Sequence, residues 1–511
     1  MHEQIEIIAS SSTGHELAIL GPDLQPLWSD ATFNGHPHAI LSDLTGNGAN
    51  EIIAHTATEL RIYAHQEEPL PTPTPAPTPT PTGERTLILV NEDRLATAYS
   101  NDPQELAALH QLTSTLQTLA AHPAVSGTIV YLEDAPGVVA AYDAWLPDPR
   151  APVMDIAQSN AGANAVADAI LSLVQGYTEA DPTYWNIVLV GDDRIIPFRR
   201  VPDASPPYFA EETYDTVVVS TTIGAAMAEN YVLTDDFYGD LIHDGVPIPV
   251  AHVADHPVGR LVERPSEMLT MVEAFLARDG TMPAAPALVV GQDLVADAAN
   301  VQRAVLQGDG IATDALIGDH WTTAQFGSAL LETPHNLSAI NTHSRHDAYA
   351  APNGAGLRAS EVLNAMYPTS GAVAFSPGCH AGLNVPPRYG LDAAVDFPEA
   401  FARRGIGYIA NTGWGIGDRS GFAYSEVLAA QLAAQLVAGE SATLGEALMT
   451  SKLAYIANKG LLDGIDEKAL LQFTLYGLPM DQLSSGAGPA SADAPSTAGY
   501  APPPVRTGGS E

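Results

Sequence analysis

Cys379 is the only cysteine of the 511-residue chain, and His380 follows it directly. The apolar residues 371–375 just before it predict a buried strand. A thiol placed where a strand gives way to a glycine-containing turn is accessible from the edge of a sheet, and the backbone there can direct N–H groups toward a bound carbonyl. Cys379 is therefore a candidate nucleophile. The simpler alternative is a small apolar side chain packed in a core.

A histidine ends a second apolar segment upstream. Residues 337–343 predict another short strand, which finishes at His343. If the two strands are parallel neighbours, His343 and Cys379 emerge at the same carboxyl edge, where open α/β sheets bind their ligands. The stretch 359–367 between them has a helical pattern and suits a right-handed crossover. The sequence thus predicts a strand–helix–strand unit that carries a two-residue catalytic centre, with His346 as the alternative histidine.

This order of elements resembles the gingipain family of caspase-like cysteine peptidases, in which a strand ending in histidine precedes a strand ending in cysteine. Three further segments are similar to that family: residues 184–197, 258–262 and 473–479. The similarity spans about residues 84–484. It implies an α/β fold with a caspase-like parallel or mixed sheet flanked by helices, in two consecutive α/β subdomains.

The resemblance also implies a cysteine endopeptidase that forms a thioester. Cys379 would attack the scissile carbonyl, His343 would protonate the departing amine, and the backbone N–H groups of Ser344 and Cys379 would hold the oxyanion. This chemistry requires no cofactor. Two residues depart from the family pattern. Ser344 replaces a glycine, which would strain a serine if the position needs φ > 0, and Leu478 replaces an aspartate.

Substrate preference depends on another segment. In the arginine-specific gingipains a Ser-Asp pair supplies the carboxylate at the base of the primary pocket, and Thr234-Asp235 resembles that pair. We therefore expect Asp235 to bind an arginine, so that cleavage follows Arg, or Lys as the second choice. An Asx turn or a calcium ligand is the alternative for Asp235. Trp414 could form an aromatic wall of the same pocket, or could simply pack beside flexible glycines.

Three rival functions use the same residues. A glutamine amidotransferase or another thiol hydrolase also uses cysteine and histidine on an α/β sheet, although usually with the cysteine first. A zinc site could draw on the histidines and the cysteine named above together with Asp347. A caspase-like binding scaffold without catalytic activity is the third, and the departures at Ser344 and Leu478 keep it open.

A Pro/Thr-rich run, residues 67–83, predicts a semi-rigid polyproline II linker. Residues 1–66 before it predict a small β unit that resembles a fragment of FG-GAP propeller repeats. Its loop offers Asp43, Asn47 and Glu51 as ligands for a structural calcium ion, or else forms a hairpin turn.

Three segments follow the linker. We expect residues 84–283 to form the N-terminal α/β subdomain and residues 284–484 the catalytic subdomain. The tail, residues 485–511, is rich in Ser, Gly, Ala and Pro, which predicts disorder.

Charge and hydropathy restrict the partners. The formal net charge of −39 argues against nucleic acid, because phosphate contacts need clustered cations, so the expected partners are proteins or peptides. The sequence shows no apolar run long enough for a membrane span and no signal peptide at its N-terminus. The style of the linker and repeat favours an extracellular or cell-surface bacterial protein. The sequence predicts no oligomeric state.

Overall fold

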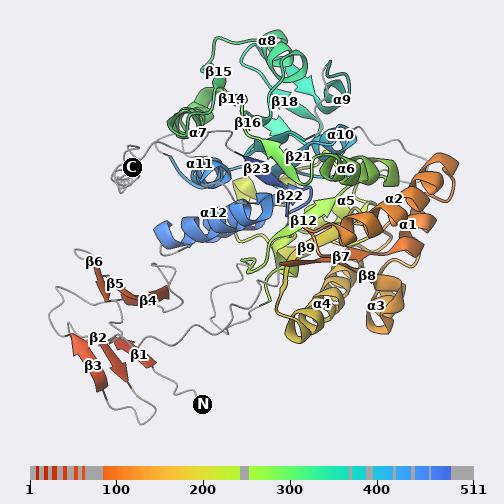
Figure 1. Ribbon diagram of the computed structural model, residues 1–511, viewed down its shortest axis with the longest axis horizontal. Helices are drawn as coiled ribbons and strands as arrows, with labels where there is room; N and C mark the ends of the chain where they lie inside the picture. The colour runs from red at the N-terminus through yellow and green to blue at the C-terminus, as the bar shows by residue number, and fades with distance from the viewer. Residues whose placement is uncertain are drawn as a thin grey trace. The chain divides into compact units, whose positions relative to one another are not determined.

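The computed structural model describes residues 84–241, 253–366, 371–386, 395–417, 422–438, 443–459 and 462–484, together with six strands between residues 7 and 63. The chain divides into two compact units, residues 1–81 and 82–511 (Figure 1). Each unit is considered by itself.

The first unit contains two antiparallel sheets, each with three described strands. These strands are β1 (Ile7–Ser10), β2 (Leu17–Leu20), β3 (Pro26–Asp30), β4 (His38–Ser42), β5 (Glu51–His55) and β6 (Leu60–Tyr63). Asp43, Asn47 and the side chain of Glu51 lie outside the described residues. The calcium site therefore stays a prediction.

In the described part of the second unit, ten strands form one sheet in the order β15-β14-β16-β20-β21-β22-β12-β9-β7-β8. Their bounds are β7 (Arg85–Val90), β8 (Thr128–Tyr131), β9 (Tyr184–Val190), β12 (Val258–Leu261), β14 (Ala287–Gly291), β15 (Thr313–Ile317), β16 (Leu337–Asn341), β20 (Val373–Ser376), β21 (Gly407–Asn411) and β22 (Phe473–Tyr476). The predicted α/β class is confirmed.

Strand direction divides this sheet into two blocks. Neighbouring strands are parallel throughout, except where β21 meets β22 in an antiparallel pair. The block from β15 to β21 therefore has its carboxyl ends at one edge of the sheet, and the block from β22 to β8 has them at the other. β22 comes from the end of the described chain and connects the two blocks.

The described part of the second unit also contains small sheets. These are β10 (Arg199–Pro202) with β11 (Tyr231–Thr234), β13 (Thr281–Pro283) with β23 (Gln482–Ser484), and the hairpins of β17 (Ser344–Arg345), β18 (Ala348–Ala350) and β19 (Gly356–Arg358).

Helices flank the sheet (Figure 1). They are α1 (Glu92–Ala98), α2 (Pro103–Ala121), α3 (Pro136–Trp145), α4 (Ile156–Ala180), α5 (Thr222–Ala228), α6 (Pro265–Ala277), α7 (Ala296–Gly308), α8 (Thr323–Gly327), α9 (Ala359–Val362), α10 (Phe397–Arg403), α11 (Ser425–Val437), α12 (Leu444–Lys459) and α13 (Gly464–Leu471). α2 packs on α6, α3 on α4, and α11 on both α7 and α12. Among these described helices, none combines the length and the apolar character that a bilayer crossing needs.

Alternation along the strands creates a core on each face of the sheet. In β16, Leu337 and Ala339 join the core that contains residues of α7, α11 and α12, whereas Ile340 joins the core that contains residues of α6 and α10. Side chains point to opposite faces with a period of two, and a sheet covered by helices on both faces needs apolar residues at every position. This is why the strand segments read as continuous apolar runs.

A buried ion pair anchors the middle of the sheet. Arg260, in β12, is completely buried, and its guanidinium donates to both carboxylate oxygens of Asp235 at 2.8 and 2.5 Å. The third guanidinium nitrogen, Nη1, donates hydrogen bonds to the carbonyls of Gly191 and Ile196 at 2.8 and 2.7 Å. A buried charge is tolerated here because it is paired and because all three guanidinium nitrogens donate hydrogen bonds.

Asp235→Asn leaves the Arg260 charge buried without its partner, so we expect the free energy of unfolding to fall by about 3–5 kcal/mol. Asp168→Asn is the matched control. Asp168 pairs with Arg199 at 2.6 Å but has a side chain 59% exposed, so its loss should cost less than about 1 kcal/mol. Equilibrium urea unfolding of both variants measures the difference, and equal destabilisation would contradict the assigned role of the pair.

Candidate active site

Three neighbouring strands end at one edge of the sheet. β14 pairs in parallel with β16, and β16 with β20. The residues that follow these strands lie near one another: Nε2 of His343 is 3.5 Å from Oδ2 of Asp293, and the hydroxyl of Ser344 donates to the Cys379 carbonyl at 2.9 Å. The prediction that the strands before His343 and Cys379 are parallel neighbours is confirmed.

The connection between β16 and β20 differs from the expected crossover. It contains the β17–β19 hairpins and the four-residue helix α9, which ends at Val362 instead of continuing to residue 367. The N–H groups of Asn364 and Ala365 donate to carbonyls three residues back, so the helical pattern tightens into turns.

Cys379 is partly buried in the turn that follows β20, with Sγ 3.5 Å from the carbonyl oxygen of Gly415. Burial raises the pKa of the thiol to about 11, and the negative charge of Glu211 contributes in the same direction. The resting thiol is therefore protonated at neutral pH. A base must accept its proton before or during nucleophilic attack.

The two candidate histidines differ in access. The side chain of His343 is 50% exposed, and its Nε2 lies 3.5 Å from Oδ2 of Asp293, at the outer limit of a hydrogen bond. His346 is buried, with Nδ1 2.6 Å from the hydroxyl of Tyr214. Burial lowers the pKa of His346 to about 4. His343 is thus better placed to exchange protons with a bound substrate.

Asp293 is a site residue that the sequence reasoning missed. It lies two residues beyond the end of β14, as His343 lies two residues beyond the end of β16. Its backbone has φ +48, a region that non-glycine residues occupy infrequently and that often marks functional positions. A polar residue at the same distance after a neighbouring predicted strand was the available signal.

The backbone at Ser344 is compatible with an oxyanion donor. The N–H of Ala350 donates to the His343 carbonyl at 2.7 Å, which makes Ser344 and Tyr349 the non-hydrogen-bonded pair of this hairpin. The Ser344 N–H therefore points away from β18. Ser344 has no positive φ, so the strain considered for a serine here is absent. Its hydroxyl donates to the Cys379 carbonyl at 2.9 Å and ties the two strand ends together.

Trp414 lies beside the cysteine turn. Its indole packs edge-on against His380 with ring centres 4.8 Å apart, and its Nε1 donates to the carbonyl of Ala210 at 3.2 Å. The backbone N–H of Trp414 donates to the buried carboxylate of Glu211 at 2.9 Å. This position is compatible with a wall of the substrate pocket. Glu211 itself gave no signal in the sequence, because a single acidic residue in a loop has no diagnostic spacing.

Asp235 does not offer an open carboxylate. Both of its oxygens bind Arg260, and its side chain is only 5% exposed. A substrate arginine could reach Asp235 only by displacing the arginine of the protein itself. The sequence pattern thus identified a carboxylate that binds a guanidinium, but that guanidinium belongs to β12. Leu478, the other departure from the family pattern, is fully buried in the apolar core.

The described residues do not bring together a set of ligands for the alternative zinc site. Within the described ranges, no group of three or more His, Cys, Asp or Glu side chains is arranged to hold a metal ion. His346 and His380 direct a ring nitrogen to Tyr214 and Glu211, respectively. Asp347 binds Arg345 at 2.8 Å.

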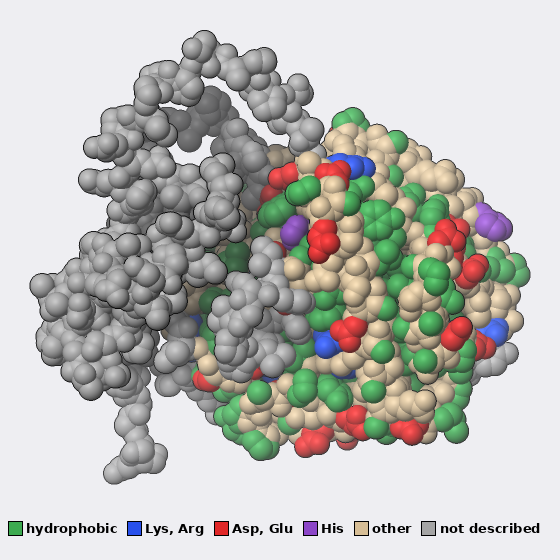
Figure 2. All heavy atoms as spheres, turned by 90° about the horizontal axis from the view of Figure 1, so that it is seen from below, with side chains coloured by type: hydrophobic (Ala, Val, Ile, Leu, Met, Phe, Trp, Pro, Cys, Tyr) green, Lys and Arg blue, Asp and Glu red, His purple; other side chains and the backbone are tan. Residues whose placement is uncertain are grey.

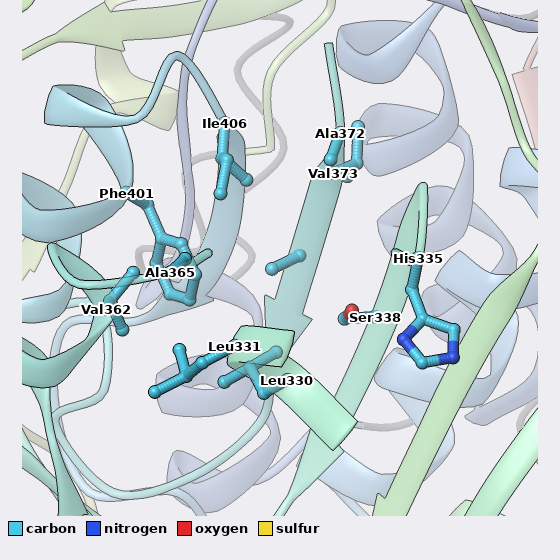
Figure 3. Close-up of a pocket in the computed structure, with 11 residues that line it drawn as sticks. Leu330, Leu331, His335, Ser338, Val362, Ala365, Ala372, Val373, Phe401 and Ile406 are labelled. Carbon is cyan, nitrogen blue, oxygen red and sulfur yellow. The ribbon is translucent and has the colours of Figure 1, made fainter. Parts of the chain in front are cut away.

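The pocket in Figure 3 lies away from the cysteine. It involves the early strand residues Ser338 and Val373, so it is at the amino ends of β16 and β20, opposite the Cys379 edge. Phe401 and Ile406 contribute to its mostly apolar lining. His335, its one imidazole, already contacts Asp314 at 3.1 Å. We interpret it as a packing gap.

Figure 2 shows one face of the molecule, on which the acidic side chains of the described residues are scattered among apolar and neutral ones and do not form one patch.

One protein-family model matches this chain, and solved structures resemble it. The family model described as peptidase family C25 matches residues 104–484. A complex of the Porphyromonas gingivalis RgpB pro- and mature domains is 16% identical, covering 78% of this chain and 79% of that chain with a TM-score of 0.49. The Arg-specific cysteine proteinase gingipain R is 15% identical, with 80% of each chain covered and a TM-score of 0.48.

A third structure, described only as a protease, is 12% identical, covers 78% of each chain and has a TM-score of 0.50. This likeness concerns the fold alone. The search of curated protein sequences found no match.

The raised thiol pKa predicts how Cys379 reacts with iodoacetamide. Because the thiolate is the reactive form, the alkylation rate should keep rising from pH 7 to pH 10, by about tenfold per pH unit. An ordinary cysteine, with a pKa of about 8.5, would reach a plateau within that range. Since Cys379 is the only thiol, mass spectrometry of the intact protein measures the rate directly. A plateau below pH 8 would contradict the buried neutral thiol.

Proposed function

Since this chain belongs to peptidase family C25 and is a cysteine-type peptidase, we propose that it cleaves internal peptide bonds with a His343–Cys379 dyad. The observation that carries the proposal is the set of contacts at the ends of three adjacent parallel strands, where His343 lies 3.5 Å from Asp293 and the neighbouring Ser344 donates to the Cys379 carbonyl at 2.9 Å. A nucleophile, a base and a group that orients the base are the parts that covalent acyl transfer needs.

The proposed reaction begins with the thiol protonated. His343 accepts the thiol proton as Sγ of Cys379 attacks the scissile carbonyl carbon, and the N–H groups of Ser344 and Cys379 stabilise the oxyanion. Collapse of the tetrahedral intermediate breaks the C–N bond, and the imidazolium of His343 protonates the leaving amine. Water then hydrolyses the thioester, with His343 as the base. Asp293 orients the ring of His343 through the 3.5 Å contact.

We further propose a preference for a basic P1 residue, arginine before lysine. Asp235 is not the source, because Arg260 occupies it. The support is the surplus of 60 acidic over 21 basic residues and the exposed Asp215, which lies four residues after Glu211. Such surroundings attract cationic peptides. Protein or peptide chains are accordingly the proposed substrates.

Fluorogenic peptides that differ only at P1 (Arg, Lys, Asp or Asn) test the proposal. We expect cleavage after Arg, loss of all activity in Cys379→Ala, and a decrease in kcat/KM of roughly 10²–10⁴-fold in His343→Ala. His346→Ala is the control histidine, and it should retain activity if its protein folds.

Two other results would change the conclusion. Cleavage after Asp or Asn would keep the dyad but reject the basic P1 preference. Folded protein that cleaves no peptide would favour the binding scaffold, and an unchanged rate in His343→Ala would reject the dyad.

A further inference from the structure

We propose that Glu211 is a positioning residue that acts through His380 to hold the turn presenting Cys379. This proposal rests on the cysteine-peptidase function proposed above.

The turn itself requires support. His380, directly after Cys379, has φ +52, in the left-handed region that non-glycine residues rarely occupy. Its N–H donates to the Gly413 carbonyl at 2.7 Å, and its ring stacks on Tyr214 with centres 3.6 Å apart and planes inclined by 8°. The side chain is completely buried, with Nε2 2.8 Å from Oε2 of Glu211.

The charges around His380 determine the protonation state of its imidazole. Burial lowers the pKa of His380, so the ring is neutral at neutral pH. Burial would raise the pKa of Glu211, but the hydrogen bond from His380 and the charge and hydrogen bond of Lys468 outweigh it, and the net shift is downward. An ionised carboxylate only accepts hydrogen bonds. Nε2 of His380 therefore carries the ring proton and donates a hydrogen bond to Glu211.

The same carboxylate holds a second loop next to the thiol. Oε1 of Glu211 accepts the N–H of Trp414 at 2.9 Å and lies 2.5 Å from Nζ of Lys468. A Cβ on Gly413 would come within 2.3 Å of that oxygen, so the loop is built closely around it. Two residues after Gly413, the Gly415 carbonyl is 3.5 Å from Sγ of Cys379. Glu211 therefore connects both loops that flank the nucleophile.

These contacts cross between distant parts of the sequence. Glu211 lies between β10 and α5, whereas His380, Trp414 and Lys468 belong to the half of the chain that carries the dyad. Glu211 is buried and cannot touch a substrate. Its influence on the reaction must pass through the groups it holds.

The test compares Glu211→Gln with Glu212→Gln, the same change at the exposed neighbouring residue. In Glu211→Gln we expect kcat per folded molecule to fall by about tenfold or more, because small displacements of a nucleophile are costly. KM should change by less than about threefold, and Glu212→Gln should match the wild type. Lower thermal stability with an unchanged kcat would overturn the proposal.

A double-mutant cycle with His380→Asn checks the route, since asparagine tolerates the left-handed backbone. If Glu211 acts through His380, the double variant should be no worse than the more damaged single variant, within about threefold. If the double variant instead lowers kcat by the product of the two separate effects, Glu211 does not act through His380. If Glu211→Gln cannot be obtained folded, His380→Asn alone decides: a tenfold loss of kcat supports the proposal and an unchanged kcat rejects it.

Alkylation of Cys379 separates this proposal from the peptidase assignment. Glu211→Gln removes a negative charge that disfavours the thiolate, so iodoacetamide at pH 8 should react faster although peptide turnover falls. If even the wild type cleaves no peptide, the proposed function fails, and the alkylation rates still test the positioning. Rates that are identical in wild type, Glu211→Gln and His380→Asn would then reject it.

Discussion

The register of three parallel strands is the constraint from which the candidate site follows. Parallel neighbours run in the same direction, so the segments that follow three adjacent strands emerge at one edge of the sheet. Asp293, His343 and Cys379 are far apart in the sequence, yet two strand pairings bring the segments that carry them to the same edge. Because those strands are buried on both faces, a shift of register would bury the wrong side chains and is strongly disfavoured.

Much of this arrangement could be predicted from the sequence. The apolar strands before His343 and Cys379 have a clear pattern, and their parallel pairing follows from a crossover connection. The partner of Asp235 could not be predicted, because Arg260 lies in a separate strand and meets it only in the folded sheet. Glu211 was equally hidden, since its contacts with His380 and Lys468 depend on a loop that crosses between the two halves.

Several of the few basic residues of this protein are buried in its interior. Six described cationic side chains are buried: Arg94, Arg194, Arg200, Arg260, Lys452 and Lys468. Arg200 is a clear example, with both of its terminal nitrogens bound to Asp193 at 2.7 and 2.6 Å. Burying an unpaired charge is costly, so each such residue must be matched by acceptors. Fifteen described acidic side chains are buried as well, so carboxylates outnumber cations in the described interior.

The position of β22 has a consequence for how the protein matures during synthesis. This strand, residues Phe473–Tyr476, separates β21 from β12 in the sheet, so the two blocks cannot join before it emerges. Lys468, just upstream, completes the cluster beside Cys379. A nascent chain that ends before these residues already contains β14, β16 and β20, but it lacks Lys468, which contacts Glu211 beside the cysteine turn. The cluster around Glu211 is therefore completed only by residues that are synthesised after nearly all of the described catalytic unit.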